Sequence, residues 1–227
     1  MTIAHHENVL QGSEEWIAMR CGILTASEMK NIITPAKLQY ASNDKERSHV
    51  YELLAQRITG YVEPQYISDD MMRGLRDELD AKLAYAKNYA QTNDVGFITN
   101  DKFGFKIGYS PDALVGDDGQ IECKSRRQKY QIETILADDM PADYMIQVQT
   151  GLLVSERKWC DFISYSGGLP MMVKRVYPDP AVHAAIAAAA TLFETKVSDL
   201  FKKYEVRLAD QNARLIPTER KIEQEIF

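Results

Sequence analysis

Two short polar runs in the middle of the chain combine the side chains that metal-assisted hydrolysis requires. Asp112 ends a Gly-Tyr-Ser-Pro-Asp run, and after nine intervening residues Glu122 and Lys124 lie in a Glu-Cys-Lys run. Because side chains alternate across a strand, Glu122 and Lys124 point the same way while Cys123 points away from them. Two carboxylates and an ammonium group held together can bind a divalent metal ion and orient a water molecule. We therefore take this segment as a candidate site for cutting a phosphodiester bond.

Two residues outside this segment would complete such a site. Glu78 lies in the middle of a predicted helix, at the edge of its apolar face, and Gln147 lies on another predicted helix among apolar neighbours. A buried glutamine requires hydrogen-bond partners, because an unpaired polar group in the core costs about 1–3 kcal/mol. Each also has a plain structural interpretation, Glu78 as a solvent-facing glutamate and Gln147 as a surface or capping residue. The Glu-Cys-Lys run alone is equally compatible with a solvated pair on an exposed strand.

Length, composition and charge are those of an ordinary soluble globular protein. With 227 residues, 45% of them hydrophobic and 26% charged, the chain can form one domain with a sizeable core. We find no signal peptide and no run long and apolar enough to span a membrane. Its three cysteines match no zinc or disulfide spacing, so we expect a cytoplasmic, reduced protein. A net charge of −6 argues mildly against a protein that coats nucleic acid, but not against an enzyme that holds DNA in one groove.

A change of hydrophobic period along the chain separates predicted helices from predicted strands. We expect helices over residues 25–33, 45–58, 69–91, 131–137, 142–155 and about 180–216. We expect strands over residues 96–99, 103–109, 113–115, 121–124, 159–166 and 171–177. This order predicts an α/β fold of one domain, in which a central mixed sheet of about five strands is flanked by helices and followed by a long C-terminal helix.

Two local patterns lead to specific structural expectations. Thr25 and Glu28 have the spacing of a helix capping box, and the apolar residues after them predict a helix that ends before Pro35. The helix over residues 69–91 has a helically spaced apolar stripe, which we expect to face the core. The stripe contains Met72, Leu75, Leu79 and Leu83.

Taken in chain order, the helix glutamate, the Ser-Pro-Asp turn, the Glu-x-Lys strand and the helix glutamine resemble the PD-(D/E)xK nuclease superfamily. The chain is similar to its phage lambda exonuclease-like branch, the YqaJ-type viral recombinases. The likeness includes an N-terminal motif that runs from Trp16 through Arg20 and Gly22 to Glu28, and it covers about residues 13–155. The resemblance implies a restriction-endonuclease-like fold, with a single domain over residues 1–227, a core at about 13–178 and a C-terminal helix at about 180–216.

The resemblance implies a role for each residue of the candidate site. Asp112 and Glu122 would bind two Mg²⁺ ions, or Mn²⁺ in their place, and the backbone carbonyl of Cys123 could reach a metal. Lys124 would position the attacking water, and Glu78 would complete the site. The catalytic set implied in this way is Glu78, Asp112, Glu122, Lys124 and Gln147.

A second set of residues matches positions that bind the terminal 5′-phosphate in this family. These are Arg20, Ser27, Ser110 and Gln147, with Thr25 beside them as either a DNA-binding or a purely capping residue. Arginine binds phosphate in a bidentate manner, and a serine in the first turn of a helix lies among free N–H groups that attract an anion. A surface salt bridge is the alternative role for Arg20.

Two further features concern DNA contact. Met71 falls where the family places an apolar wedge that parts the DNA ends, although a helical methionine is as often a core residue, and Met72 is the other candidate. Ser125, Arg126 and Arg127 follow Lys124 where the lambda-like pattern has an apolar and proline continuation. This departure adds positive charge beside the proposed metals, where a scissile phosphate would lie.

The resemblance implies a Mg²⁺-dependent 5′→3′ exonuclease that acts on linear double-stranded DNA with a 5′-phosphorylated end. It would release 5′-mononucleotides and leave 3′ single-strand overhangs for phage-type recombination. It also implies a homotrimeric ring and a single-strand annealing protein as partner. Two alternatives stay open: a structure- or sequence-selective endonuclease on the same fold, and a catalytically silent DNA-binding module. An endonuclease would have no use for a terminal 5′-phosphate site.

Overall fold

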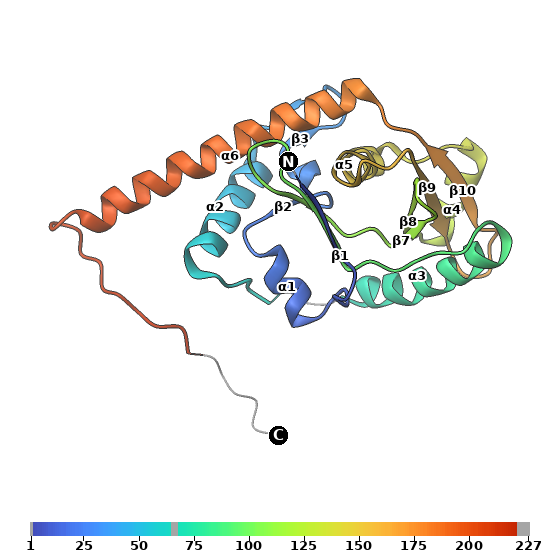
Figure 1. The fold of residues 1–227 in the computed structure, drawn as a ribbon, viewed down its shortest axis with the longest axis horizontal. Coiled ribbons are helices and arrows are strands. Elements are labelled where there is room, and N and C mark those ends of the chain that lie inside the picture. Colours follow the sequence, from blue (N-terminus) through green and yellow to red (C-terminus); the bar gives the residue numbers. More distant parts are fainter. Residues whose placement is uncertain (1, 65–67, 222–227) are drawn as a thin grey trace.

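A buried helix, α5 (Met145–Ser155), lies between two four-stranded sheets in the computed structural model, which describes residues 2–64 and 68–221 (Figure 1). The helix contains no charged residue, and nine of its eleven residues are buried. A helix that is apolar on all sides is stable only when it is covered on all sides. α5 contacts β5 and β6 of one sheet and β9 of the other. It is therefore the element through which the two sheets share one core.

The strands form two mixed sheets and a small hairpin. The first sheet has the order β1 (Ile3–His6), β5 (Phe97–Asn100), β6 (Ile107–Tyr109) and β2 (Leu24–Thr25). The second has the order β10 (Met172–Val176), β9 (Trp159–Tyr165), β8 (Gly119–Ser125) and β7 (Ala113–Val115). β2 pairs with β6 and β8 with β9 in parallel, whereas the other pairs in these sheets are antiparallel. β3 (Ile33–Thr34) and β4 (Gln39–Tyr40) form the hairpin. The mixed α/β class is confirmed, but the strands are divided between two sheets instead of one.

The remaining helices cover the outside of this framework (Figure 1). They are α1 (Glu14–Arg20), α2 (Asp44–Thr59), α3 (Asp69–Asn88), α4 (Gln128–Ala137) and α6 (Pro180–Ala209), with short 3₁₀ turns at Met29–Asn31 and Ala142–Tyr144. α2 starts after the capping side chain of Asn43 and ends before Gly60, whose φ of 64° gives a left-handed helix end.

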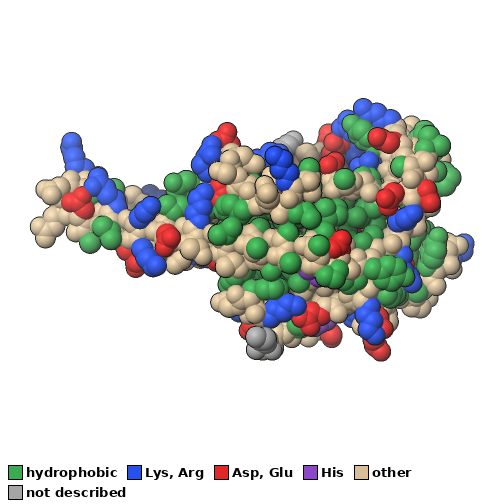
Figure 2. Space-filling view, turned by 90° about the horizontal axis from the view of Figure 1, so that it is seen from above, with side chains coloured by type: hydrophobic (Ala, Val, Ile, Leu, Met, Phe, Trp, Pro, Cys, Tyr) green, Lys and Arg blue, Asp and Glu red, His purple; other side chains and the backbone are tan. Residues whose placement is uncertain are grey.

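The long C-terminal helix is confirmed, although it ends at Ala209 and not near residue 216. One face of its first half is buried as far as Val197, and the ion pairs Arg57–Glu194 and Lys196–Glu46 join it to α2. Its last turns project beyond the body of the molecule (Figure 1, Figure 2), where no buried face supports further turns. Within the described ranges, no helix combines the length and the apolar character that a membrane span requires.

The second sheet is enclosed by α3 on one face and α5 on the other. Cys123 packs in a cluster with Ala81 and Tyr85 of α3, whereas Glu122 bonds to Gln147 of α5. The predicted alternation along β8 is therefore confirmed. The consequence is that the candidate catalytic face of the strand points into the space between the sheet and the central helix.

The predicted helix over residues 25–33 is wrong. Thr25 is the last residue of β2, which pairs in parallel with Gly108, and only a 3₁₀ turn over Met29–Asn31 follows. The Thr25 hydroxyl donates to the Glu28 carboxylate (2.8 Å) instead of accepting a backbone N–H as a helix cap would. Pairing with β6 satisfies the backbone here, so tertiary structure overrides the local capping signal.

The predicted inward orientation of the apolar stripe on α3 is also wrong. Leu75, Leu79 and Leu83 are each about 60% exposed, at 62%, 60% and 62%. The helix packs instead through Ala81 and Tyr85, and the Tyr85 hydroxyl donates to buried Asp161 (2.7 Å). Periodicity identifies the faces of a helix but not which of them meets the sheet. An exposed row of leucines on one protein surface is a feature of interaction sites.

Candidate active site

Glu122 is a buried carboxylate of β8 on the side of the sheet that faces α5. It is only 1% exposed, and three elements supply its hydrogen-bond donors. The Gln147 amide of α5 and the Lys124 ammonium of β8 both donate to Oε1, at 2.5 and 2.7 Å, and the Tyr109 hydroxyl of β6 donates to Oε2 at 3.1 Å. A buried carboxylate is tolerated only with such partners. The side chain is therefore held in one position.

Asp112 and Glu78 bring two further carboxylates toward Glu122. Asp112 follows β6, and its Oδ2 accepts the backbone N–H of Cys123. Burial raises the pKa of Asp112 well above its ordinary value, and the negative charges of Glu122 and Glu78 raise it further. Burial also raises the pKa of Glu78, which lies on α3, and the charge of Glu122 adds to this effect. Lys82 and Lys124 offset part of it. The site thus holds more negative charge than its own cations balance.

Lys124 stays protonated in this environment. Burial alone would lower the pKa of its ammonium group, but the carboxylates of Glu122 and Asp112 outweigh burial and raise the pKa. The Nζ atom also lies 5.6 Å from the centre of the Tyr144 ring. A permanently charged ammonium cannot act as a base, but it can donate hydrogen bonds to a water molecule or to a phosphate oxygen.

The donor set fits a hard divalent cation that keeps several of its waters. In the described part of the chain, no group of three His, Cys, Asp or Glu side chains converges as a closed metal cage. Mg²⁺ usually needs only one or two carboxylates and fills its other positions with water and substrate. Asp112, Glu122 and the Cys123 carbonyl offer oxygen atoms of this kind. Burial raises the pKa values of both Asp112 and Glu78, and the charge of Glu122 raises both further, so an added cation would relieve repulsion here.

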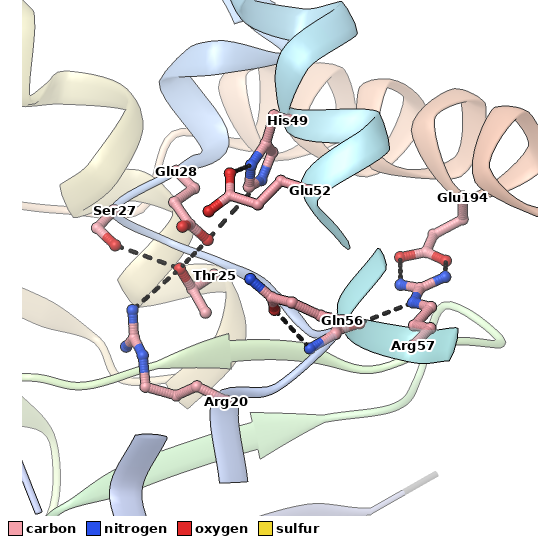
Figure 3. A network of polar contacts seen from close by, with 10 residues as sticks. Arg20, Thr25, Ser27, Glu28, His49, Glu52, Gln56, Arg57 and Glu194 are labelled. Atoms are coloured by element: carbon pink, nitrogen blue, oxygen red, sulfur yellow. Dashed lines mark hydrogen bonds and ion pairs between the residues drawn. The ribbon is translucent and has the colours of Figure 1, made fainter. Parts of the chain in front are cut away.

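Four residues of the predicted phosphate-binding set lie together, and we call them the Arg20 cluster; Figure 3 shows three of them, Arg20, Thr25 and Ser27. Arg20 ends α1, and its Nη1 and Nη2 atoms lie 3.4 Å from the hydroxyls of Ser110 and Thr25, while Ser27 lies 3.2 Å from Thr25. The guanidinium stacks 4.1 Å from the centre of the Trp16 ring. Burial lowers the pKa of Arg20, although it remains a strong base. A partly desolvated arginine surrounded by hydroxyls is a suitable anion receptor.

The sequence predicted Ser27 in the first turn of an α-helix, and this is wrong. Ser27 lies between β2 and the 3₁₀ turn that follows. The anion site therefore depends on the Arg20 side chain and the hydroxyls. Gln147 also lies apart from the cluster in its hydrogen bonding, since its amide donates to Glu122.

The loop after Arg20 is fixed by α2, which explains the glycine in its motif (Figure 3). The Gly22 N–H donates to the Gln56 side chain, and the Gly22 carbonyl accepts from Arg57, both at 2.8 Å. Arg57 is held in turn by two hydrogen bonds of 2.7 Å to Glu194 of α6. Gly22 has a φ of 69°, and a Cβ atom there would approach the Arg57 side chain to 2.7 Å. Only glycine fits both constraints.

Met71 and Met72 are exposed at the start of α3, at 49% and 42%. An exposed methionine at this position is available for contact with DNA, so the wedge stays a prediction for Met71.

Two aromatic residues of the site were not identified from the sequence as site residues. Tyr109 anchors Glu122, and Gly151 of α5 leaves room for its ring, because a Cβ atom there would lie 2.6 Å from Tyr109. The Tyr144 ring lies beneath Lys124. The available signal was weak: a tyrosine on an inward strand position needs a partner for its hydroxyl, but the sequence does not name that partner.

The sequence profile of the YqaJ-like viral recombinase domain matches residues 15–158. This range includes the carboxylates, Lys124, Gln147 and Arg20. Among curated proteins, no match to the chain was found.

Solved structures show the same likeness. The alkaline exonuclease LHK-Exo from Laribacter hongkongensis is 31% identical, with a TM-score of 0.77 over 87% of this chain and 98% of that chain. Its complex with dAMP has the same identity and coverage and a TM-score of 0.78. A phage-related exonuclease from Haemophilus somnus 129PT is 13% identical, with a TM-score of 0.53 over 78% of this chain and 96% of that chain, which indicates a shared fold alone.

Proposed function

The chain belongs to the YqaJ-like viral recombinase family, and we propose that it is an exonuclease that degrades linear double-stranded DNA. The observation that carries the proposal is the buried Glu122, fixed by three donors beside Asp112 and a protonated Lys124. The similar LHK-Exo is an alkaline exonuclease, and its complex holds dAMP, a deoxynucleoside monophosphate. Release of mononucleotides is the product class that we propose here.

In the proposed reaction, Asp112, Glu122 and the Cys123 carbonyl would hold one or two Mg²⁺ ions, or Mn²⁺. When bound, the metal neutralises negative charge that develops on the phosphate and on the leaving oxygen. Lys124 donates a hydrogen bond to the attacking water and then stabilises the charge on the phosphate. Glu78 adds negative charge next to the metal position.

Two residues act through Glu122 in this scheme. Gln147 and Tyr109 donate to its two carboxylate oxygens and so keep them in place. A carboxylate that cannot rotate presents the same oxygen to a cation in every turnover, which is the kind of preorganisation that catalysis requires.

The Arg20 cluster supports a 5′→3′ direction. We assign Arg20, Thr25, Ser27 and Ser110 to the terminal 5′-phosphate, because a desolvated guanidinium with flanking hydroxyls suits a doubly charged group. An enzyme that binds the 5′ end degrades that strand from this end, and the opposite strand remains as a 3′ single-strand overhang for recombination. A homotrimeric ring and a single-strand annealing partner belong to the same proposal, and the exposed leucines of α3 offer an apolar surface for contact with another protein chain.

A three-substrate digestion tests this function against the endonuclease alternative. We expect Mg²⁺-dependent loss of a linear duplex with 5′-phosphates, slower loss of the same duplex with 5′-hydroxyls, and no cutting of a covalently closed circle. Equal cutting of the circle would favour the endonuclease. No cleavage of any substrate with Mg²⁺ or Mn²⁺, together with retained DNA binding, would favour the catalytically silent module.

A further inference from the structure

A second group of basic residues surrounds a cavity of about 400 Å³ beside the β8 end of the candidate active site. Arg73 of α3, Arg126 and Arg127 after β8, and Gln128 at the start of α4 line it, together with Asp77, Ser166 and Gly167. We call it the arginine pocket. None of these residues has a role in the reaction as described above, so the question is what the pocket binds.

Arg126 lines this pocket, and its side chain contains a donor without a hydrogen-bond partner. Its guanidinium lies 5.2 Å from the Tyr130 ring centre and 5.5 Å from that of Tyr144, and Nη1 donates to the Tyr144 hydroxyl at 3.0 Å. Its Nε atom is buried and lacks a hydrogen-bond partner among the described residues. A buried donor of a charged group without an acceptor is destabilising, so an anionic oxygen supplied by a ligand would be favourable there.

The start of α4 adds a second, independent attraction for an anion. The helix begins after Arg127, whose side chain makes no capping hydrogen bond, and Gln128 of the first turn lines the cavity. The first N–H groups of a helix have no partner within the helix, and its N-terminus carries a partial positive charge. Phosphate groups bind readily at such a position.

Two acidic residues pair with arginines of the pocket, Asp70 from outside the cavity and Asp77 from its lining. Asp70, exposed at the start of α3, accepts hydrogen bonds of 2.8 Å from both Arg73 and Arg127. The Arg127 guanidinium lowers the pKa of Asp70, so this carboxylate is charged at neutral pH. Asp77 accepts from Ser125 and also lies near Arg73. Exposed ion pairs of this kind contribute little to stability, so a phosphate can displace the Asp70 carboxylate at small cost.

The pocket is physically connected to Lys124. The Tyr144 ring has the Lys124 ammonium at 5.6 Å and the Arg126 guanidinium at 5.5 Å from its centre. Lys124 and Arg126 are two residues apart, and the chain advances about 6.6 Å over two residues of a strand. The backbone N–H of Arg126 still bonds to β9 through Tyr165 at 2.7 Å, so the strand geometry continues to this point. The cavity therefore lies one strand step beyond the catalytic lysine.

We propose that the arginine pocket binds a backbone phosphate of the DNA substrate next to the phosphate that is cleaved. The proposal rests on the proposed nuclease function, because a neighbouring phosphate is present only when DNA lies in the active site. Arg126 donates to the phosphate through its guanidinium, Arg73 and Arg127 turn toward it from Asp70, and the α4 N-terminus completes the shell. We expect the pocket to bind DNA of any base sequence, since it contacts only the sugar-phosphate backbone of the DNA.

Salt-dependent DNA binding tests the pocket separately from cleavage. The Lys124→Ala protein serves as the inactive parent, and its affinity for a 5′-phosphorylated duplex is measured by fluorescence anisotropy over a range of salt concentrations. Adding Arg126→Gln should weaken binding and reduce the slope of log affinity against log salt by about 0.9, the value for one phosphate contact. Adding Arg76→Gln is the matched control, because Arg76 is exposed on α3 and does not line the cavity. It should leave the slope unchanged.

We expect Asp70→Asn in the same parent to change DNA affinity in the opposite direction from Arg126→Gln. Removing the competing carboxylate should tighten DNA binding a few-fold, a gain that a folding defect cannot imitate. An Arg126→Gln slope equal to that of Arg76→Gln, or unchanged affinity in Asp70→Asn, would overturn the proposal while the parent still binds DNA. Failure of the parent itself to bind DNA at low salt would overturn the nuclease function as well.

Discussion

Arg20 and Arg126 are both partly buried arginines that stack on aromatic rings, yet their surroundings differ. Arg20 lies against Trp16 and faces the hydroxyls of Ser110 and Thr25. Arg126 lies between two tyrosines at an open cavity, next to arginines that Asp70 already pairs. A desolvated guanidinium bonded to hydroxyls, with the Glu28 carboxylate behind Thr25, can distinguish a terminal phosphate from a hydroxyl. An open, charge-compensated pocket instead adds affinity that depends on salt.

If the Arg20 cluster and the arginine pocket bind DNA and take no part in the chemical step, removal of Lys124 should abolish cleavage and leave DNA binding at both sites unchanged. We expect Lys124→Ala to lower the cleavage rate by at least about 10²–10³-fold, the usual effect of losing one group that stabilises transition-state charge. Single-turnover digestion with Mg²⁺ gives the rate, and anisotropy gives the affinity. Lys87→Ala, an exposed lysine near the end of α3, is the control and should digest DNA normally. Wild-type activity in Lys124→Ala would show that the chemistry lies elsewhere.

The selectivity assigned to the Arg20 cluster predicts a substrate-dependent defect. A hydrogen bond to a charged group contributes about 1.5–3 kcal/mol. Arg20→Gln should therefore slow digestion of 5′-phosphorylated ends by about ten- to a hundredfold. On 5′-hydroxyl ends the same variant should be close to wild type. The ratio of the two rates is the measurement, and a uniform loss on both ends would contradict an end-binding role.

A substitution at Tyr109 tests the positioning of Glu122 without changing the Arg20 cluster or the arginine pocket. Tyr109→Phe removes the donor to Oε2 of Glu122 but keeps the ring that packs on Gly151. We expect a loss of about tenfold in rate at limiting Mg²⁺, because a hydrogen bond to a charged group is worth about 1.5–3 kcal/mol. Saturating Mg²⁺ should restore part of the rate, while the 5′-phosphate preference and the salt slope stay unchanged. A changed end preference would mean that the Arg20 cluster and the carboxylates are not independent.

The smallest expected effect is a change in the thermal stability of the metal-free protein when Asp112 is replaced. Because the fold raises the pKa of this carboxyl, the metal-free folded protein binds more protons than the unfolded chain between the ordinary and the raised pKa. Its stability therefore falls as the pH rises through that window. Asp112→Asn removes the repulsion and can still accept the Cys123 N–H, so its Tm at neutral pH should be a few degrees higher.

Thermal unfolding at several pH values checks this stability effect. The difference in Tm between Asp112→Asn and wild type should grow with pH, and Mg²⁺ should stabilise wild type more than the variant. A variant that is less stable than wild type at neutral pH, without metal, would show that Asp112 is not under electrostatic strain.

The parts of the site that the sequence could predict depend on strand and helix periodicity. Glu122 and Lys124 share a face because they are two residues apart on β8, and Glu78 and Gln147 lie on the helices expected for them. The ends of α2 follow from Asn43 and Gly60, which act through local backbone geometry. The α/β class follows in the same way from the order of periodic segments.

The parts that the sequence could not predict depend on contacts between distant segments. Thr25 forms a strand because Gly108 is beside it, and no local signal reports that neighbour. The orientation of α3 depends on the bond between Tyr85 and Asp161, which are far apart in the chain. Tyr109 and Arg126 become parts of sites only when β6, β8 and the 3₁₀ turn that ends at Tyr144 meet. These contacts depend on the tertiary fold, so neither local propensity nor residue spacing predicts them.

The central claim is that Lys124 and its carboxylates cleave DNA inward from a 5′ end. The most direct measurement follows one linear duplex with a 5′-phosphate, labelled on the same strand at the 5′ end in one sample and at the 3′ end in the other. With Mg²⁺, the 5′ label should appear at once as a mononucleotide, while the 3′-labelled strand shortens progressively. Early release of the 3′ label, or of a 5′-labelled oligonucleotide from an internal cut, would contradict the account.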